Sequence, residues 1–216
     1  MPASDVFEKA RRALAAGRLL DAKLLLVGAI TELAMRVGIR PVLTGGTSVD
    51  FYAAEALETD PGTWRAWRPS IDVDVVFLQG DAVGDAGTLR RMLAESGFEP
   101  SAGAKTAMPV EGQRGWRHPK VPIPIEIIGH AMAGDRSRVV QLDVEGLPVF
   151  VRGPEDTLFE HVEWAAHTKD QRSWTRALAI AAAQEKRLDK AYLRELAKSR
   201  GYLPELEQCL RGEALT

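Results

Sequence analysis

Residues 71–77 read Ile-Asp-Val-Asp-Val-Val-Phe and give the clearest strand signal in the chain. β-Branched residues alternate with two aspartates, so a strand here places Asp72 and Asp74 together on one face. Three apolar residues are predicted to face the core from the other side: Ile71, Val73 and Val75. Aspartate is disfavoured in strands, so a carboxylate pair on a strand built for burial indicates a special role.

The paired carboxylates of Asp72 and Asp74 are costly as neighbours. Two unit charges about 6.6 Å apart, the spacing of alternate strand residues, repel by roughly 2.5 kcal/mol at an effective dielectric constant of about 20. A divalent cation removes this cost, and Mg²⁺ (or Mn²⁺) takes oxygen ligands of this kind. An edge strand with its polar face in water is the alternative, and an isolated Asp-x-Asp pattern favours it.

A second strand is predicted from Val121 to Ile128, and it carries Glu126 between apolar neighbours. Pro122 and Pro124 confine this strand to a sheet edge or limit its ladder hydrogen bonds. If it lies beside the first strand, Glu126 joins the two aspartates in one acidic cluster. By itself, Glu126 reads as a solvated glutamate at a sheet edge.

Residues 45–48 read Gly-Gly-Thr-Ser and lie between a short apolar strand at 41–43 and a predicted helix at 48–57. Glycines let the backbone approach an anion closely, and the amides at a helix N-terminus point toward it. Thr47 and Ser48 add hydroxyl donors for phosphate oxygens. The alternative is a tight turn capped by one of these hydroxyls. Neither a dinucleotide-binding fingerprint nor a P-loop is present.

Taken together, residues 42–48, the following helix, residues 70–75 and a later acid on a strand resemble the polymerase-β-like nucleotidyltransferase superfamily. Within it, the chain is most similar to the minimal bacterial type of abortive-infection and toxin–antitoxin systems (AbiEii-like). The likeness covers residues 40–180. It includes Gly-Pro-Glu-Asp at 153–156, which opens a tail helix, and Lys169 in the region of the last motif.

The resemblance implies a magnesium-dependent transfer of a nucleoside monophosphate from a nucleoside triphosphate, such as ATP, to a hydroxyl of an RNA, a protein or a small molecule. Asp72 and Asp74 would hold Mg²⁺, and Glu126 would bind a second metal or accept the proton of the attacking hydroxyl. The implied nucleotide-binding residues are Gly45, Gly46, Thr47, Ser48 and Lys169. A cognate antitoxin-like partner is also implied.

The gap between the diglycine and the aspartate pair is longer than this resemblance leads one to expect, which indicates an insertion at 59–69. The insertion contains Trp64-Arg65-Ala66-Trp67-Arg68. Base stacking on an aromatic ring is worth about 1–3 kcal/mol, and arginine pairs with phosphate, so a lid over nucleotide or RNA is one interpretation. Packing of one tryptophan into the core is the other.

The predicted fold class is α+β: a nucleotidyltransferase-like mixed β-sheet flanked by helices, with a helical C-terminal tail. The predicted division is 1–38 for two N-terminal helices, 39–152 for the core and 153–216 for the tail. A hairpin is expected at 139–151, where Glu145-Gly146 joins two apolar runs. Further helices are expected at 4–14, 19–37, 84–96, 154–167, 173–186, 189–199 and 204–211.

Composition limits the class of protein. The 28 Lys and Arg residues against 30 Asp and Glu argue against a protein that coats nucleic acid. A single cysteine and the absence of a long apolar run or a signal pattern predict a cytoplasmic protein without a membrane segment. Two rivals to an active transferase stay open: a catalytically degenerate relative that senses nucleotides or binds a partner, and an unrelated α+β domain.

Overall fold

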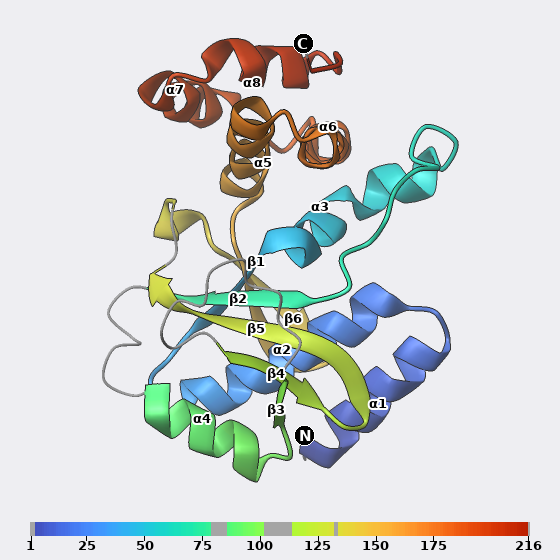
Figure 1. The fold of residues 1–216 in the computed structure, drawn as a ribbon, viewed down its shortest axis with the longest axis vertical. Coiled ribbons are helices and arrows are strands. Elements are labelled where there is room, and N and C mark those ends of the chain that lie inside the picture. The colour runs from blue at the N-terminus through green and yellow to red at the C-terminus, as the bar shows by residue number, and fades with distance from the viewer. Residues whose placement is uncertain (1–2, 79–85, 102–113, 132–133, 216) are drawn as a thin grey trace. The chain divides into compact units, whose positions relative to one another are not determined.

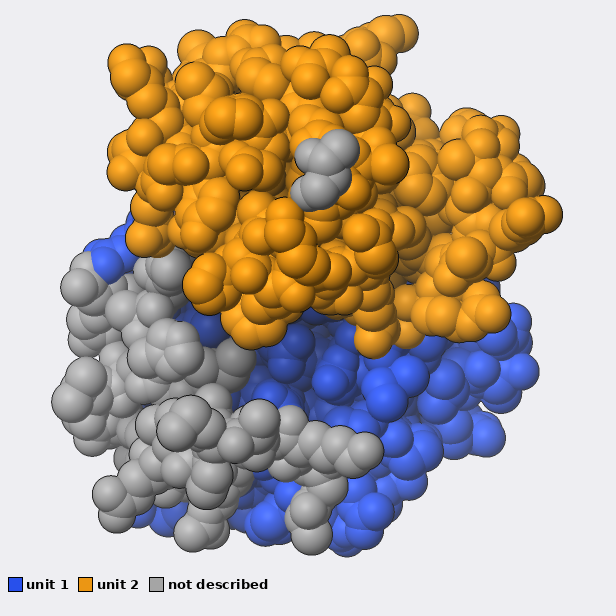
Figure 2. All heavy atoms as spheres, turned by 45° about the horizontal axis from the view of Figure 1, so that its top comes forward, with its two compact units in different colours: residues 1–47, 70–152 blue, residues 48–69, 153–216 orange. Residues whose placement is uncertain are grey.

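The computed structural model describes residues 3–78, 86–101, 114–131 and 134–215. Contacts divide the chain into two compact units, one formed by residues 1–47 and 70–152 and the other by residues 48–69 and 153–216 (Figure 2). Contact clustering therefore groups 48–69 with the C-terminal helices, whereas the sequence-based division assigns them to the core. That division, into 1–38, 39–152 and 153–216, stays a prediction.

The first unit is built on one seven-stranded mixed sheet with the order β3-β4-β5-β2-β1-β7-β6 (Figure 1). The strands are β1 Pro41–Thr44, β2 Val73–Phe77, β3 Glu99–Ser101, β4 Arg114–His118, β5 Val121–Ala131, β6 Val140–Val144 and β7 Leu147–Val151. At the centre, β2 pairs antiparallel with β1 and parallel with β5. The sheet is thus mixed, as predicted.

The central strand β2 begins two residues later than predicted. Ile71 is 77% exposed and lies outside the strand, so the prediction that it faces the core was wrong. The reason is local, because the carbonyl of Asp72 accepts a hydrogen bond from the hydroxyl of Thr47 and not from a neighbouring strand. Val73 and Val75 are fully buried, as their alternation with the aspartates predicted.

The strand β5 lies inside the sheet, between β4 and β2, so of the two outcomes predicted from its prolines the edge position was wrong. Its parallel register with β2 begins at Ile125, after both prolines. On the β4 side the register is irregular along the segment that contains Pro122 and Pro124. The missing amide hydrogens therefore interrupt the ladder at one end, and residues 125–127 pair on both sides.

The predicted hairpin at 139–151 is confirmed as β6 and β7, which pair from Val140↔Val151 to Val144↔Leu147. Its two turn residues both have positive φ, 54° at Glu145 and 83° at Gly146. Positive φ at both positions is the type I′ geometry, whose twist matches that of the flanking strands.

Among the described residues, four α-helices have residues in the first unit: α1 Ala3–Ala15, α2 Leu19–Met35, α4 Ala86–Glu95 and the first turn of α3 Gly45–Thr59. The helix α2 packs against α1 and β7 and is buried along most of its length. In the parts of the chain described, no helix is both long and apolar enough to cross a bilayer.

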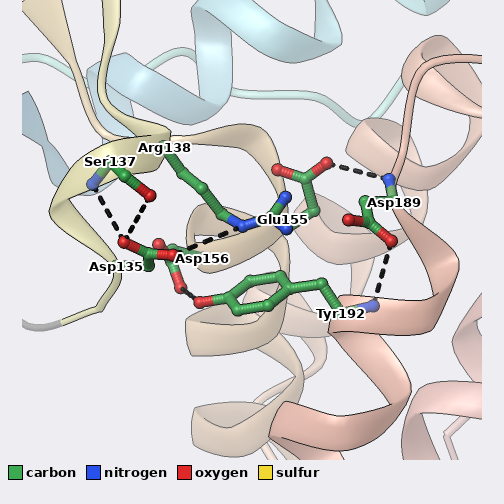
Figure 3. A network of polar contacts seen from close by, with 7 residues as sticks. All are labelled: Asp135, Ser137, Arg138, Glu155, Asp156, Asp189 and Tyr192. Atoms are coloured by element: carbon green, nitrogen blue, oxygen red, sulfur yellow. Dashed lines mark hydrogen bonds and ion pairs between the residues drawn. The ribbon is translucent and has the colours of Figure 1, made fainter.

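The second unit holds the rest of α3 with α5 Pro154–Thr168, α6 Gln171–Gln184, α7 Lys190–Arg200 and α8 Leu203–Leu210. Asp170 caps α6, and Asp189 caps α7 by accepting from the amide of Tyr192. The buried acids of the Pro-Glu-Asp segment tie α5 to α7 (Figure 3). Glu155 accepts from the amide of Asp189 at 2.9 Å, and Asp156 accepts from the hydroxyl of Tyr192 at 2.7 Å. This motif therefore serves packing between helices.

Candidate active site

Two of the three predicted acids are direct neighbours across the sheet. Asp74 of β2 is the register partner of Glu126 of β5, and both residues are partly buried. Residues paired across adjacent strands lie about 4.8 Å apart and project from the same face. The strand order of the sheet thus brings together two carboxylates that are 52 residues apart in the sequence.

Gly45, the first residue of α3, packs directly on the carboxylate of Asp74. A Cβ on Gly45 would lie 2.1 Å from Oδ2 of Asp74 and 2.9 Å from its Cγ, and the glycine has a φ of +61°. Only glycine combines this close approach with this backbone conformation. The diglycine therefore sets the N-terminus of α3 against one of the acids.

Asp72 precedes β2 and is held by two hydroxyls. Its Oδ1 accepts a hydrogen bond from Oγ of Ser70, and its carbonyl accepts one from Oγ1 of Thr47 at 2.6 Å. Thr47 has no exposed surface. The segment that precedes β2 is thereby fastened to the first turn of α3 within the first unit, which positions Asp72 next to the sheet.

Sequence reasoning missed Lys23, a completely buried lysine of α2. Its Nζ donates a hydrogen bond to the carbonyl of Ser70, the residue whose hydroxyl binds Asp72. A lysine beside the apolar run 24–30 of a predicted core helix was the available signal, because lysine is rarely buried without a polar partner.

The local field is negative at Glu126. Burial raises the pKa of its carboxyl above the ordinary value, and the negative charge of Asp72 raises it further. Asp72 therefore acts electrostatically on Glu126, although Asp72 lies outside the strand. Carboxylate oxygens in a site with excess negative charge are a donor set that fits Mg²⁺ or Mn²⁺.

The three acidic side chains do not form a complete metal-coordination site in their present rotamers. Within the described ranges, no group of three or more His, Cys, Asp or Glu side chains is arranged to hold a metal ion. Joint binding of one ion by Asp72, Asp74 and Glu126 would thus require side-chain rotation. The donor chemistry fits a divalent cation, and the present rotamers do not complete the site.

The other predicted nucleotide-binding residues have different surroundings. Gly46 and Thr47 are buried in the first turn of α3, and Ser48, which follows them, has no exposed surface. Lys169 belongs to the second unit, where it ends α5 as an exposed residue with a left-handed φ of 58°. Their roles toward a triphosphate stay predictions.

Comparison with known proteins identifies the fold. No family model matches the chain, and no curated protein matches it. An antigenic nucleotidyltransferase-like protein from Paracoccidioides brasiliensis superposes with a TM-score of 0.53 at 15% identity, over 91% of this chain and 94% of that one.

Two structures of the antibiotic-resistance factor ANT(2″)-Ia also match. The solution structure gives a TM-score of 0.47 at 12% identity over 83% of this chain and 92% of that one. The crystal structure with adenylyl-2″-tobramycin gives 0.46 at 15% identity over 82% and 98%. The superposition on the Paracoccidioides brasiliensis protein, with its TM-score of 0.53, shows that the chain has a nucleotidyltransferase-like α+β fold, as the resemblance predicted.

Proposed function

We propose that this protein transfers a nucleoside monophosphate from a nucleoside triphosphate to a hydroxyl of an RNA, a protein or a small molecule, with Mg²⁺ or Mn²⁺. One observation carries the proposal: Asp74 is in register with Glu126 and packs on Gly45 at the start of a helix. The nucleotidyltransferase-like fold supports the same reaction class.

Different residues would bind the metal ion, bind the phosphate oxygens and accept the proton. Asp72 and Asp74 would hold the divalent cation, which when bound neutralises the charge of the triphosphate. The backbone at Gly45 and Gly46 would bind phosphate oxygens at the helix N-terminus. Glu126 would accept the proton of the attacking hydroxyl, and its raised pKa makes its carboxylate a stronger base.

The proposed transfer is a single displacement at the α-phosphorus of the triphosphate. The acceptor oxygen forms a bond to the α-phosphorus as the bond from that phosphorus to the bridging oxygen breaks, and pyrophosphate leaves. The proton of the acceptor hydroxyl moves to Glu126 and then to solvent. Catalysis of this kind consists of positioning and charge neutralisation.

The test uses α-³²P-labelled ATP, GTP, CTP and UTP in turn, with Mg²⁺ and cellular lysate or total RNA as the source of acceptors. We expect acceptor labelling from at least one nucleotide and a loss of at least about 100-fold in Asp74→Asn, since the variant removes a charge used in the transition state. Glu58→Gln, which changes an exposed acid of α3, is the matched control and should keep full activity. Equal labelling by Asp74→Asn and wild type would refute the assignment.

A degenerate transferase is the second candidate, and the incomplete metal geometry favours it. Such a protein would bind nucleotide or a partner, such as an antitoxin-like protein, without turnover. Magnesium with a nucleoside triphosphate would then raise the melting temperature of the wild type by mass action, with no acceptor labelled by any nucleotide.

A further inference from the structure

A cationic cavity lies within the second unit, between the Trp- and Arg-bearing insertion and the start of α6. Its volume is about 390 Å³, and its lining residues are Ala66, Trp67, Arg68, Gln171, Arg172, Thr175 and Arg176. Three of these seven residues are arginines and none is acidic. This imbalance contrasts with the net charge of −2 for the whole chain.

Two contacts describe the polar groups beside Arg68 and Arg172. Asp170, two residues before Arg172, uses its carboxylate to cap α6 through the amides of Arg172 and Ser173. The guanidinium of Arg68 donates to a backbone carbonyl, that of Trp67. Neither of these contacts pairs the guanidinium of Arg68 or Arg172 with a carboxylate.

Trp67 supplies a second, independent observation. Its indole Nε1 is buried and has no hydrogen-bond acceptor among the described residues. An unsatisfied buried donor costs about 1–3 kcal/mol, so an acceptor that reaches this group on a small rotation of the ring would be favoured. Oxyanions accept hydrogen bonds, and guanidinium groups bind phosphate in a bidentate manner.

We infer that this cavity binds a phosphate ester, with Arg68, Arg172 and Arg176 as the cationic ligands and Trp67 as a neutral donor. The inference goes beyond the proposed transfer reaction and does not depend on it. The phosphate could belong to the backbone of a single-stranded nucleic acid or to a free nucleotide. The chemistry recognised is the same in both cases.

Binding is measured in EDTA, without a triphosphate, so that failure of the transfer reaction has no bearing on the result. One probe is a fluorescein-labelled 12-nucleotide single-stranded RNA followed by anisotropy, and the other is uridine monophosphate followed by calorimetry. Arg68→Gln and Arg172→Gln should each weaken binding about tenfold, the loss expected for one charge-assisted hydrogen bond. In the RNA arm each should also lower the slope of log K against log salt by about 0.7.

The matched control is Arg65→Gln, which removes the same charge from an exposed residue of the same segment that does not line the cavity. It should leave the affinity within about twofold, because distant surface charges are screened by salt. Trp67→Phe keeps an aromatic ring and removes the indole N–H that has no acceptor in the described part of the chain. This variant should bind severalfold more weakly and melt no lower than wild type.

The two binding measurements distinguish a nucleic-acid backbone from a free nucleotide as the source of the phosphate. Tight binding of RNA alone, sensitive to Arg68→Gln and Arg172→Gln, assigns the site to a nucleic-acid backbone. Equal sensitivity with uridine monophosphate assigns it to free nucleotides. Equal effects of Arg65→Gln and Arg68→Gln, or no binding of either probe, would overturn the inference.

Discussion

Replacement of Gly45 by alanine tests the contact on which the candidate site depends. Two costs add at this position. An alanine at positive φ costs about 1–2 kcal/mol, and displacement of the Asp74 side chain from its rotamer costs a further 0.5–1.5 kcal/mol or so. The second cost follows from the 2.1 Å between the new Cβ and Oδ2 of Asp74. We therefore expect Gly45→Ala to lower the free energy of unfolding by about 2–3 kcal/mol.

Gly17→Ala is the matched control. Gly17 has a φ of +75°, but nothing lies within 4 Å of the position its Cβ would take. It should therefore show the backbone cost alone, about 1–2 kcal/mol. For a chain of this size, 1 kcal/mol corresponds to about 2–4 °C in melting temperature, so we expect decreases of about 8 °C for Gly45→Ala and about 4 °C for Gly17→Ala.

Thermal unfolding followed by circular dichroism measures both decreases, and the transfer assay measures the consequence for function. Gly45→Ala should abolish labelling because it displaces Asp74, while Gly17→Ala should retain it below its melting temperature. Identical melting temperatures for the two variants would show that Asp74 does not press on Gly45. Full activity in Gly45→Ala would show that the contact is irrelevant to the reaction.

Three further variants test single contacts. Glu126→Gln should raise the melting temperature at pH 7 and leave it nearly unchanged at pH 4. The folded pKa of Glu126 lies above its ordinary value, so its contribution to stability is complete below pH 4.5 and is lost as the pH rises through the folded value. An equal change at both pH values contradicts this. Thr47→Val, which deletes the hydrogen bond to Asp72, should cost about 1 kcal/mol in chemical denaturation, and Thr47→Ser should recover part of it. Tyr192→Phe should cost about 1.5–3 kcal/mol, because the buried carboxylate of Asp156 loses its hydroxyl donor, and unchanged stability would show that water replaces it.

Local sequence signals predicted those elements whose torsions and caps are decided by neighbouring residues. The Glu145-Gly146 turn fixed the hairpin at 139–151, because both positions need positive φ. The C-terminal helices were predicted to within a few residues, although α6 begins at Gln171, two residues before the predicted start, because Asp170 accepts from the amides of Arg172 and Ser173.

The alternation of apolar and acidic residues also identified the strand that carries Asp74. The diglycine lies inside α3, which begins at Gly45, three residues before the predicted helix at 48–57. What the sequence by itself determined is therefore local: torsions, caps and the candidate acids. Only the tertiary structure decided that β5 lies inside the sheet, that Glu126 sits beside Asp74, and that buried Lys23 holds Ser70. These are contacts between residues about 50 positions apart, and their partners are chosen by the packing of the whole sheet and its helices, which no short stretch of sequence encodes.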